Sequence, residues 1–538
     1  METTPQGKPT QPPYRRTTTL LGRPRGGPRS SRAVARDDGV RLFLLGTVGA
    51  AGSCCVLLGV LRPGSPFVAP GASSWFWTSP AIPAGHPESS GQFLGIMLVY
   101  LGIALLLGAW FETIRALRTG CRIRLRQLLL LLVAWATPIL LAPPLFSRDV
   151  YSYAGQGQMV AKGLNPYLRG PSVLGSGPFL SLVDPLWRHA TAPYGPAWER
   201  LSGFVVQLSG HRVLWAVAGF RMVAVIGLAL LAWGVPALAH AVGRDSTLAF
   251  TVAVLNPLVL LVLLGGAHND ALMLGLLVLG CTLAARRHPL AGLACCALAA
   301  EIKAPALIAA LFIGWAWWGE GQDLRQRLAK TLLAVCFTVA VMAAIGVIAG
   351  MSWRWVGALF GAGTVVSWLD PVTAVGLAFT HIGHALGYHG GSGAFVRGSR
   401  VIGLGIAAAI SIRLLIRSRD QEPIRALGWS IFAFVLLGPV LWPWYYAWAF
   451  VFLAVIADGW TLRLVAALSA VACFADMPSP RLLISAPTSD VVVGWLVLGA
   501  LVLAYVAIRS AAYSRQRTAA MGIEPGDVAT HVQTRFRE

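Results

Sequence analysis

The sequence predicts an all-α polytopic membrane protein, and two observations support that prediction. Of the 538 residues, 56% are hydrophobic and only 12% are charged, which is more apolar than an average soluble domain. Many apolar residues fall in near-continuous runs of about 20, the length that a helix needs to cross a hydrocarbon core. Runs such as 94–111 lack the alternating polarity of a membrane strand, so they are expected to be helices.

The formal net charge of +21 could indicate a nucleic-acid partner, but the positions of the basic residues argue against one. Most of the Lys and Arg side chains stand beside or between apolar runs, where they orient helices and attract the membrane surface. Membrane lipid is therefore an expected partner and nucleic acid is not. The eight cysteines include no CxxC pair, so neither a disulfide framework nor a cysteine zinc site is expected.

Three regions divide the chain. Residues 1–38 form a basic tail, rich in Pro and Gly, that is predicted to be disordered and cytoplasmic. Residues 39–510 form the membrane domain with about 14 helices, and residues 511–538 form a second cytoplasmic tail. The expected spans are 41–61, 92–111, 127–146, 212–239, 247–266, 271–285, 289–302, 304–318, 331–350, 398–416, 424–441, 449–460, 462–474 and 491–508.

The basic loops set the sidedness of these spans. Five arginines between positions 115 and 126 mark a short cytoplasmic loop, so the next span runs outward and brings Asp149 to the outer face. The apolar stretch 289–318 has basic clusters on both flanks, so it is predicted to enter and return as two short helices that meet near Lys303. Residues 147–211 and 351–397 are the two long outer loops, and loops of this length are usually functional.

Asp149 is the residue around which a site is expected. It stands at the mouth of a predicted membrane helix, where a carboxylate in so apolar a protein marks a candidate site. A carboxylate can take a proton from an attacking hydroxyl, and partial desolvation brings its pKa closer to the working pH. The structural alternative is that Asp149 caps a helix of the outer loop and pairs with Arg148.

Other residues predicted on the outer face supply matching chemistry. A cation such as Lys303 could hold a phosphate leaving group, and aromatic faces suit stacking on sugar rings or lipid. Each of these residues also has a structural interpretation. Asn269 or Asp270 would cap the following helix, Lys303 would reach to the interface, and the remaining candidates would form an interfacial aromatic belt. These are Tyr151, Tyr153, Trp444, Tyr445 and Tyr446.

Several segments together resemble one family of glycosyltransferases. They are FSRDVYSYAGQGQMVAKGLNPY, TAPYGPAWE, LNPLVLLVLLGGAHNDALM, EIKAPA and LWPWYYAW. In this order they resemble the actinobacterial α-1,6-mannopyranosyltransferases MptA and MptB of the GT-C superfamily, and HNDALM with AGQGQ favours MptB. The resemblance implies a GT-C-type membrane fold in the plasma membrane, with the active site on its outer, periplasmic face.

The resemblance also implies a reaction. Mannose would move with inversion from polyprenyl-phosphate mannose to the α-1,6-mannan of a phosphatidylinositol mannoside or lipomannan acceptor, toward lipoarabinomannan. GT-C enzymes use an Asp of an early outer loop as the base, and Asp149 occupies that place. Arg148, His268 and Lys303 are then candidates for the donor phosphate. Candidates for sugar or lipid contacts are Tyr151, Tyr153, Tyr194, Asn269, Asp270, Trp444, Tyr445 and Tyr446.

Two other function classes remain open on the sequence. A transporter or flippase for a polyprenyl-linked glycolipid could use the same buried charges as a pathway, although no internal repeat is visible. A non-catalytic membrane scaffold is the third interpretation. No cofactor is expected, because no glycine fingerprint for a nucleotide is visible. The histidines that follow His381 lack the spacing of a metal site.

Overall fold

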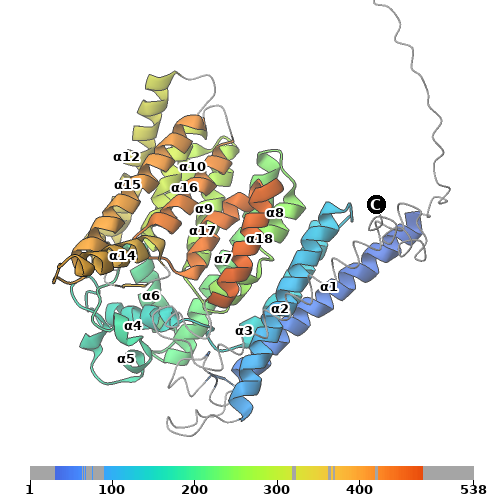
Figure 1. Cartoon of the computed structure of the whole chain (residues 1–538), viewed down its shortest axis with the longest axis horizontal. Coiled ribbons are helices and arrows are strands. Elements are labelled where there is room, and N and C mark those ends of the chain that lie inside the picture. The colour runs from blue at the N-terminus through green and yellow to red at the C-terminus, as the bar shows by residue number, and fades with distance from the viewer. Residues whose placement is uncertain are drawn as a thin grey trace, which may run out of the picture.

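The computed structural model describes residues 31–475, apart from 63–64, 66, 68–74, 77–89, 318–322, 362–364, 368–369 and 419–421. Every regular element within these ranges is helical, as the sequence predicts (Figure 1). The α-helices are α1 (Ser31–Val60), α2 (Ser90–Arg118), α3 (Leu125–Leu141), α4 (Asp149–Ala161), α5 (Pro178–Leu182), α6 (Pro196–Leu208), α7 (Val213–Ala241), α8 (Ser246–Ala253), α9 (Asp270–Ala285), α10 (Pro289–Ile302), α11 (Ile308–Phe312), α12 (Leu324–Ala349), α13 (Trp355–Gly361), α14 (Pro371–Ala385), α15 (Gly393–Arg417), α16 (Pro423–Leu437), α17 (Tyr446–Val455) and α18 (Gly459–Ala475).

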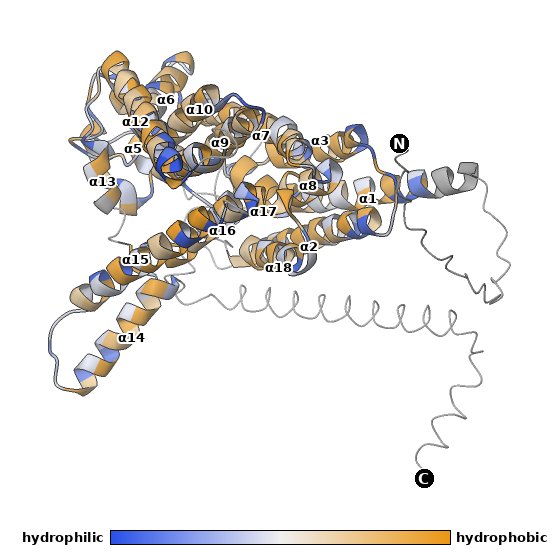
Figure 2. Cartoon of the chain, turned by 90° about the horizontal axis from the view of Figure 1, so that it is seen from above, coloured by the Kyte–Doolittle hydropathy of each residue, from blue (hydrophilic) through white to orange (hydrophobic). Residues whose placement is uncertain are grey.

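Many of these helices have the composition of membrane helices. Five described stretches are long and apolar enough to cross a bilayer, namely Asp38–Val60, Phe93–Arg118, Val213–Ala241, Leu324–Ala349 and Gly393–Arg417. Seven shorter apolar helices accompany them, and apolar residues run along most of the helices in Figure 2. The protein is therefore a polytopic membrane protein, as its composition predicts.

Some expected boundaries need correction. Helix α1 begins at Ser31, so residues 31–38 form its first turns and do not belong to a disordered tail. Residues 1–30, the expected span 491–508 and the tail 511–538 lie outside the described residues. The predicted pair of short helices is confirmed, because α10 ends at Ile302 and a 3₁₀ turn from Ala304 to Leu307 leads into α11. Lys303 lies between them.

The long outer loop 147–211 contains more regular structure than the sequence suggests. It folds into α4, α5 and α6, and α4 packs along α6. Helix α4 is hard to predict because it contains Gly155 and Gly157, which have poor helix propensity. Gly157 is required there, because an added Cβ would lie 2.9 Å from the Val206 side chain of α6. The three helices form a layer beside one end of the apolar helices in Figure 1.

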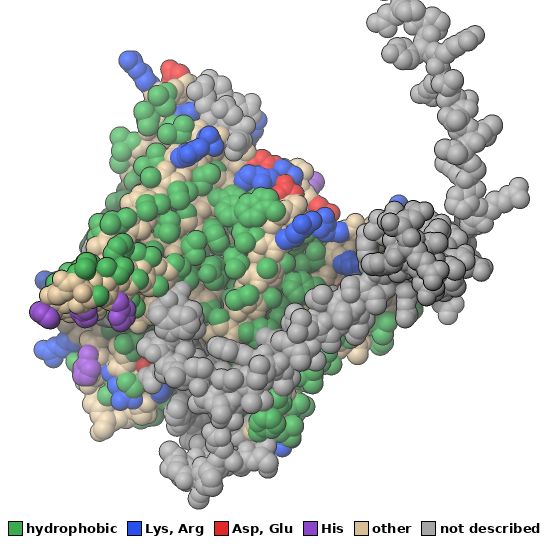
Figure 3. Space-filling view, in the orientation of Figure 1, with side chains coloured by type: hydrophobic (Ala, Val, Ile, Leu, Met, Phe, Trp, Pro, Cys, Tyr) green, Lys and Arg blue, Asp and Glu red, His purple; other side chains and the backbone are tan. Residues whose placement is uncertain are grey.

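Turns that are predicted on the cytoplasmic side lie together. Arg244, between α7 and α8, forms an ion pair with Glu422, just before α16. Arg425 pairs with Asp458, just before α18, at 2.9 Å. Figure 3 shows Lys, Arg, Asp and Glu side chains along the upper edge of the molecule, above a broad hydrophobic surface. These ion pairs bring together the turns that precede α8, α16 and α18.

Candidate active site

Asp149 is the first residue of α4, and its carboxylate lies in a partly enclosed position. Its side chain is 22% exposed, and its amide N–H donates to Ser147 Oγ at 3.1 Å. Burial raises the pKa of this carboxyl above its usual value, whereas the neighbouring His268 and Lys303 lower it. A raised pKa strengthens the affinity of this carboxylate for a proton.

Asp270 is the first residue of α9 and is the opposite kind of carboxylate. It has no exposed surface, and its two oxygens accept hydrogen bonds from Lys303 Nζ at 2.8 and 2.7 Å. The indole Nε1 of Trp448 also donates to Asp270 Oδ1, at 2.6 Å. A buried carboxylate needs such partners to offset its lost hydration. Asp270 is therefore a fully paired counter-ion.

Lys303 ends α10 and is enclosed by aromatic rings as well as by Asp270. Its Nζ lies 5.0 Å from the ring centre of Tyr445 and 5.3 Å from that of Trp448, distances typical of cation–π contacts. The two rings stack on each other with their centres 4.0 Å apart. The side chain of Lys303 is only 10% exposed, so it does not reach to the membrane interface as the structural alternative proposed.

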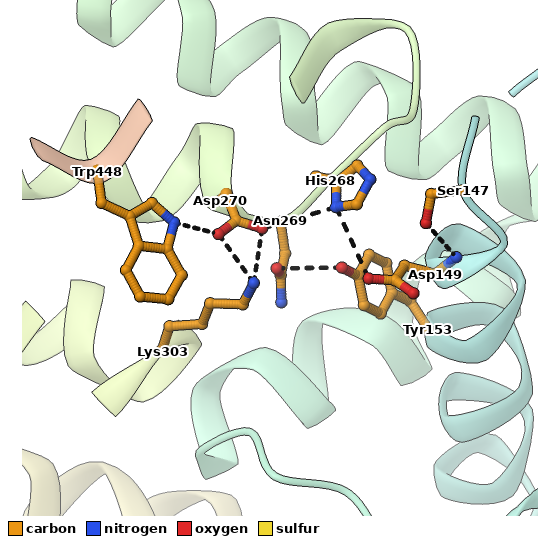
Figure 4. A network of polar contacts seen from close by, with 8 residues as sticks. All are labelled: Ser147, Asp149, Tyr153, His268, Asn269, Asp270, Lys303 and Trp448. Carbon is orange, nitrogen blue, oxygen red and sulfur yellow. Dashed lines mark hydrogen bonds and ion pairs between the residues drawn. The ribbon is translucent and has the colours of Figure 1, made fainter. Parts of the chain in front are cut away.

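His268 lies between the two carboxylates. Its Nδ1 is 3.7 Å from Asp149 Oδ2 and 3.7 Å from Asp270 Oδ2, which is longer than a hydrogen bond. The ring is fully buried and lies against Trp444 with ring centres 4.5 Å apart. Neither ring nitrogen has a hydrogen-bond partner among the described residues. Figure 4 shows His268 joining the Asp149 and Asp270 sides of one polar cluster.

Tyr153 and Tyr194 form the aromatic wall next to this cluster. Tyr153 OH donates to Asn269 Oδ1 at 3.2 Å. The ring of Tyr153 contacts that of Tyr194 edge to face, with centres 5.6 Å apart. Burial raises the pKa of both phenols well above the usual value, so both remain neutral donors. The wall thereby links α4 to the turn before α9.

Arg221 of α7 braces the two loops that carry the site. Its guanidinium donates to the carbonyls of Leu140 and Ala142, which precede the Asp149 loop. It also donates to the carbonyl of Gly265 at 2.6 Å, just before His268. Arg221 itself is only 3% exposed. Sequence reasoning missed Arg221, although a lone cation within an apolar span is a signal that could have identified it.

The same two loops hold residues in an unusual backbone conformation. Phe146 and Ala267 have φ values of 59° and 54°, in the left-handed region that side chains with a Cβ disfavour. Each costs of order 1 kcal/mol and persists only where surrounding contacts hold it. Leu145 N–H donates to Gly265 O at 3.0 Å and ties the two loops together. The strained residues therefore lie three positions before Asp149 and directly before His268.

The structure brings most of the predicted site residues together. Asp149, His268, Asn269, Asp270 and Lys303 form one cluster, and its aromatic neighbours are Tyr153, Tyr194, Trp444 and Tyr445. Trp448 belongs to the cluster as well, although it was not among the predicted site residues. It stands in the aromatic motif at 442–448, so its residue type and position were a usable signal.

Three predicted residues lie in other surroundings. The Arg148 guanidinium donates to the carbonyl of Leu182 at 2.8 and 3.1 Å, and so binds the α5 region. Tyr151 is buried on α4, and burial raises its pKa to about 12 while Arg221 opposes this. Tyr446 stacks on Phe450 with ring centres 5.7 Å apart, along α17.

Two structural interpretations from the sequence are wrong. Neither Asn269 nor Asp270 uses its side chain to cap α9, because these groups bond to Tyr153 and Lys303. Trp444 and Tyr445 do not form a simple interfacial belt, since they contact His268 and Lys303. Asp370, in the second long outer loop 351–397, is the N-cap residue of α14, with its Oδ1 accepting from Val372 N–H at 3.1 Å. The His, Cys, Asp and Glu side chains in the described ranges form no group of three suited to a metal ion.

Comparison with known proteins identifies the class of enzyme. Residues 46–319 match the family model described as the N-terminal domain of α-(1→6)-mannopyranosyltransferase. Residues 372–512 match the MptB C-terminal domain. No solved structure matches the chain. Together with the helical fold, these matches define a polytopic membrane glycosyltransferase.

The relatives give the particular family. The chain is 33% identical over 453 residues to α-(1→6)-mannopyranosyltransferase A of Mycobacterium tuberculosis, covering 80% of this chain and 81% of the relative. It is 29% identical over 469 residues to α-(1→6)-mannopyranosyltransferase B of Corynebacterium glutamicum, covering 80% and 75%. The protein belongs to the α-(1→6)-mannopyranosyltransferase family.

Proposed function

We propose that this protein is an inverting α-1,6-mannosyltransferase. Its donor is polyprenyl-phosphate mannose, and its acceptor is the mannan backbone of lipomannan and lipoarabinomannan precursors on a phosphatidylinositol mannoside anchor. The reaction takes place on the outer, periplasmic face of the plasma membrane. The names of the relatives support the sugar and the linkage, whereas the donor and acceptor rest on the resemblance and on the chemistry of the site.

The observation that carries this proposal is the position of Asp149. Of the carboxylates in the cluster, Asp149 is the one that is partly exposed and lacks a hydrogen-bonded cation, while Asp270 is saturated by Lys303 and Trp448. A general base must be able to reach the substrate and to accept a proton. Asp149 meets both requirements, so we assign it as the base.

The reaction needs a single displacement. Asp149 accepts the proton of the acceptor's 6-hydroxyl, and the freed oxygen electron pair attacks the anomeric carbon of the mannose. The bond from that carbon to the phosphate oxygen breaks, and polyprenyl phosphate leaves with the electron pair. A β-linked donor gives an α-linked product in this way. The proton remains on Asp149 until it is lost to solvent.

Unpartnered donors support a phosphorylated ligand. The amide nitrogen of Asn269 and the indole nitrogen of Trp444 are buried donors without hydrogen-bond partners among the described residues, and the ring nitrogens of His268, at least one of which carries a proton, are also buried without one. Buried donors normally have partners, so a ligand that supplies acceptor oxygens explains them. We therefore assign His268 to the donor phosphate, with Lys303, whose charge is paired with Asp270, as the neighbouring cation. Arg148 is the remaining candidate for the phosphate.

Sugar and lipid contacts come from the aromatic residues of the same cluster. Tyr194 stands at the start of the α6 segment and faces Tyr153, and Tyr445 covers Lys303. Rings in such positions can stack against a sugar or a polyprenyl chain. The predicted parity of the helices supports an outer-face location, because α3 begins beside the arginine-rich loop 115–126 and its other end leads to Asp149.

The test is transfer of mannose in detergent from polyprenyl-phosphate mannose to a short α-1,6-mannoside. We expect Asp149→Asn to lower kcat at least about 1,000-fold, because the amide cannot accept the proton. Asp184→Asn is the matched control in the same outer segment. Asp184 Oδ1 accepts from Leu186 N–H at 3.0 Å, and an asparagine oxygen can accept the same bond, so activity should persist.

Two other outcomes of the transfer assay would change these assignments. Unchanged turnover in a folded Asp149→Asn variant would remove Asp149 as the base and leave Asp270 as the next candidate. No transfer by a folded wild type would contradict the proposed function and favour a glycolipid flippase, which should then show substrate access from both sides in reconstituted vesicles. Size exclusion and thermal unfolding report the folded state in both experiments.

A further inference from the structure

Glu301 lies outside the polar cluster, but it contacts two segments that deliver residues to it. Its side-chain Oε2 accepts from the N–H of Ala197 at 3.0 Å. Its backbone carbonyl accepts from the N–H of Gly195 at 2.8 Å. Both donors stand at the start of α6, where backbone N–H groups lack partners within the helix. One residue of α10 thus satisfies two amide groups of another helix.

Local helix preferences do not explain a glutamate at this position. Glu301 is in the last turn of α10, where the helix dipole disfavours an anion. The N-terminus of α6 favours an anion instead, and that is where the carboxylate points. Glu301 is also only 1% exposed. Its placement therefore serves the contact between α10 and α6.

Gly195 makes this close contact possible. A Cβ added at Gly195 would lie 2.6 Å from Glu301 Oε2 and 2.7 Å from the Glu301 carbonyl oxygen. Real side chains do not adopt such distances, so the backbones approach each other only because position 195 is glycine. The residue directly before it is Tyr194, and the residue two positions after Glu301 is Lys303.

Two lines of contact lead from Glu301 back to Asp149. The first follows the chain from Glu301 to Lys303, two residues on, and then runs through Asp270 and His268 by the bonds and distances given above. The second runs through the Gly195 backbone to Tyr194, whose ring contacts Tyr153 of α4. The contact between Tyr153 and Asn269 closes the ring. A shift of Glu301 therefore displaces both walls of the site.

We infer that Glu301 is a positioning residue for the transferase reaction, holding Lys303 and Tyr194 in register with Asp149 through its clamp on Gly195 and Ala197. It touches neither Asp149 nor a substrate position, so its effect is indirect. The kinetic part of this inference rests on the proposed function, whereas the clamp itself does not. Misplacement of reacting groups by about 1 Å can lower a rate by about 100-fold.

Three substitutions test the inference. Glu301→Gln retains a side-chain oxygen that can accept from Ala197 N–H, and we expect kcat within about threefold of wild type. Glu301→Asp keeps the charge but is one methylene shorter, and Glu301→Ala removes the acceptor. We expect both to lower kcat by about 10- to 100-fold with a smaller change in KM. Glu199→Gln is the control, since Glu199 is an equally buried acid on α6 whose side-chain oxygens have no hydrogen-bond partner among the described residues and so take no part in the clamp.

Hydrogen exchange of the full-length protein provides a readout that does not depend on activity. Peptides covering 191–199 should exchange faster in Glu301→Ala and Glu301→Asp than in wild type or Glu301→Gln. Wild-type kcat and wild-type protection in a folded Glu301→Ala or Glu301→Asp variant would overturn the inference. Equal loss of kcat in Glu301→Gln and Glu301→Ala would also overturn it, because rescue by the retained oxygen is required.

The two proposals fail in distinguishable ways. If the wild type does not transfer mannose, the proposed function is contradicted, and the exchange of 191–199 still decides whether Glu301 clamps α6. If Glu301→Ala does not fold, Glu301→Asp supplies the comparison with Glu301→Gln. Faster exchange of 191–199 without any loss of kcat would show that the clamp exists but does not position the site.

Discussion

Asp149 and Asp270 begin two helices of one cluster, yet their surroundings differ. Asp270 is fully buried and bonded to Lys303 and Trp448, whereas Asp149 is partly exposed and its Oδ2 lies 3.7 Å from His268 Nδ1. Residue type and position within a helix therefore do not determine the role of a carboxylate. The partners supplied by other helices determine it.

Removal of Lys303 is expected to have the largest effect on the difference between the two carboxylates. Lys303→Met would leave Asp270 buried without its cation, which costs about 3–5 kcal/mol of stability. We expect a large fall in the midpoint of thermal unfolding, and partial recovery when Asp270→Asn is added, because the unpaired charge is then gone. Lys162→Met, at an exposed position, is the control. An unchanged midpoint in Lys303→Met would contradict the paired role of Asp270.

Glu199 separates the effect of burial on a carboxyl group from the effect of pairing. It is fully buried on α6, and neither carboxyl oxygen has a hydrogen-bond partner among the described residues. Burial raises its pKa from 4.5 to about 8. Between these two pH values the carboxyl group is protonated in the folded state and ionised in the unfolded state. The free energy of unfolding is therefore highest below about pH 4.5 and declines as the pH rises through about 8.

Glu199→Gln should remove that pH dependence. Because glutamine does not ionise, the decline in the free energy of unfolding between pH 5 and pH 8, up to about 4 kcal/mol, should become flatter. Thermal unfolding in detergent at pH 5, 6.5 and 8 measures it. An identical decline in wild type and variant would show that Glu199 is not the group that titrates.

The pH dependence of transfer distinguishes Asp149 from an ordinary surface carboxylate. Its pKa is raised by burial, and the base must be deprotonated, so kcat/KM should rise with pH through a value above the usual Asp pKa of about 3.9. His268 lowers that pKa, so His268→Gln should move this limb to higher pH. Movement to lower pH would contradict the assignment of Asp149 as the base.

The smallest expected effect concerns the hydrogen bond between Tyr153 of α4 and Asn269, which precedes α9. Tyr153→Phe removes the hydrogen bond to Asn269 and leaves the Oδ1 of Asn269 without that donor. We expect a loss of about 1 kcal/mol in stability and less than a tenfold change in kcat, because the ring still fills its place against Tyr194. Differential scanning fluorimetry and the transfer assay measure the two effects. A complete loss of transfer would give the Tyr153 hydroxyl a direct part in the reaction.

Much of the architecture could be predicted from the sequence. Apolar runs predict the helical membrane fold, and the predicted sidedness of the spans led us to expect Asp149, Asp270, Lys303 and the aromatic motif near one another, as the structure has them in one cluster. The turn at Lys303 followed from cytoplasmic flanks on both sides of 289–318. These predictions succeed because hydrophobic length and charge asymmetry are local properties of the chain.

Pairing within the site could not be predicted from the sequence. Nothing in the local pattern indicates that Asp270 bonds to Lys303 and Trp448 while Asp149 does not, because those bonds join residues 33 and 178 positions apart. Arg148 stands beside Asp149 in the chain, yet its guanidinium donates to the carbonyl of Leu182 at the end of α5. Tertiary packing decides such choices, as it decides the helical state of the glycine-containing α4.

Arg221 has a consequence for the order in which the protein assembles. A single arginine in the middle of a membrane helix costs about 2.5–3.5 kcal/mol on insertion, and α7 is otherwise highly apolar. Two of its acceptor carbonyls, at Leu140 and Ala142, have already been synthesised when α7 emerges, whereas Gly265 follows later. We expect α3 to wait beside the insertion machinery for α7, so that the two helices enter the lipid as a pair.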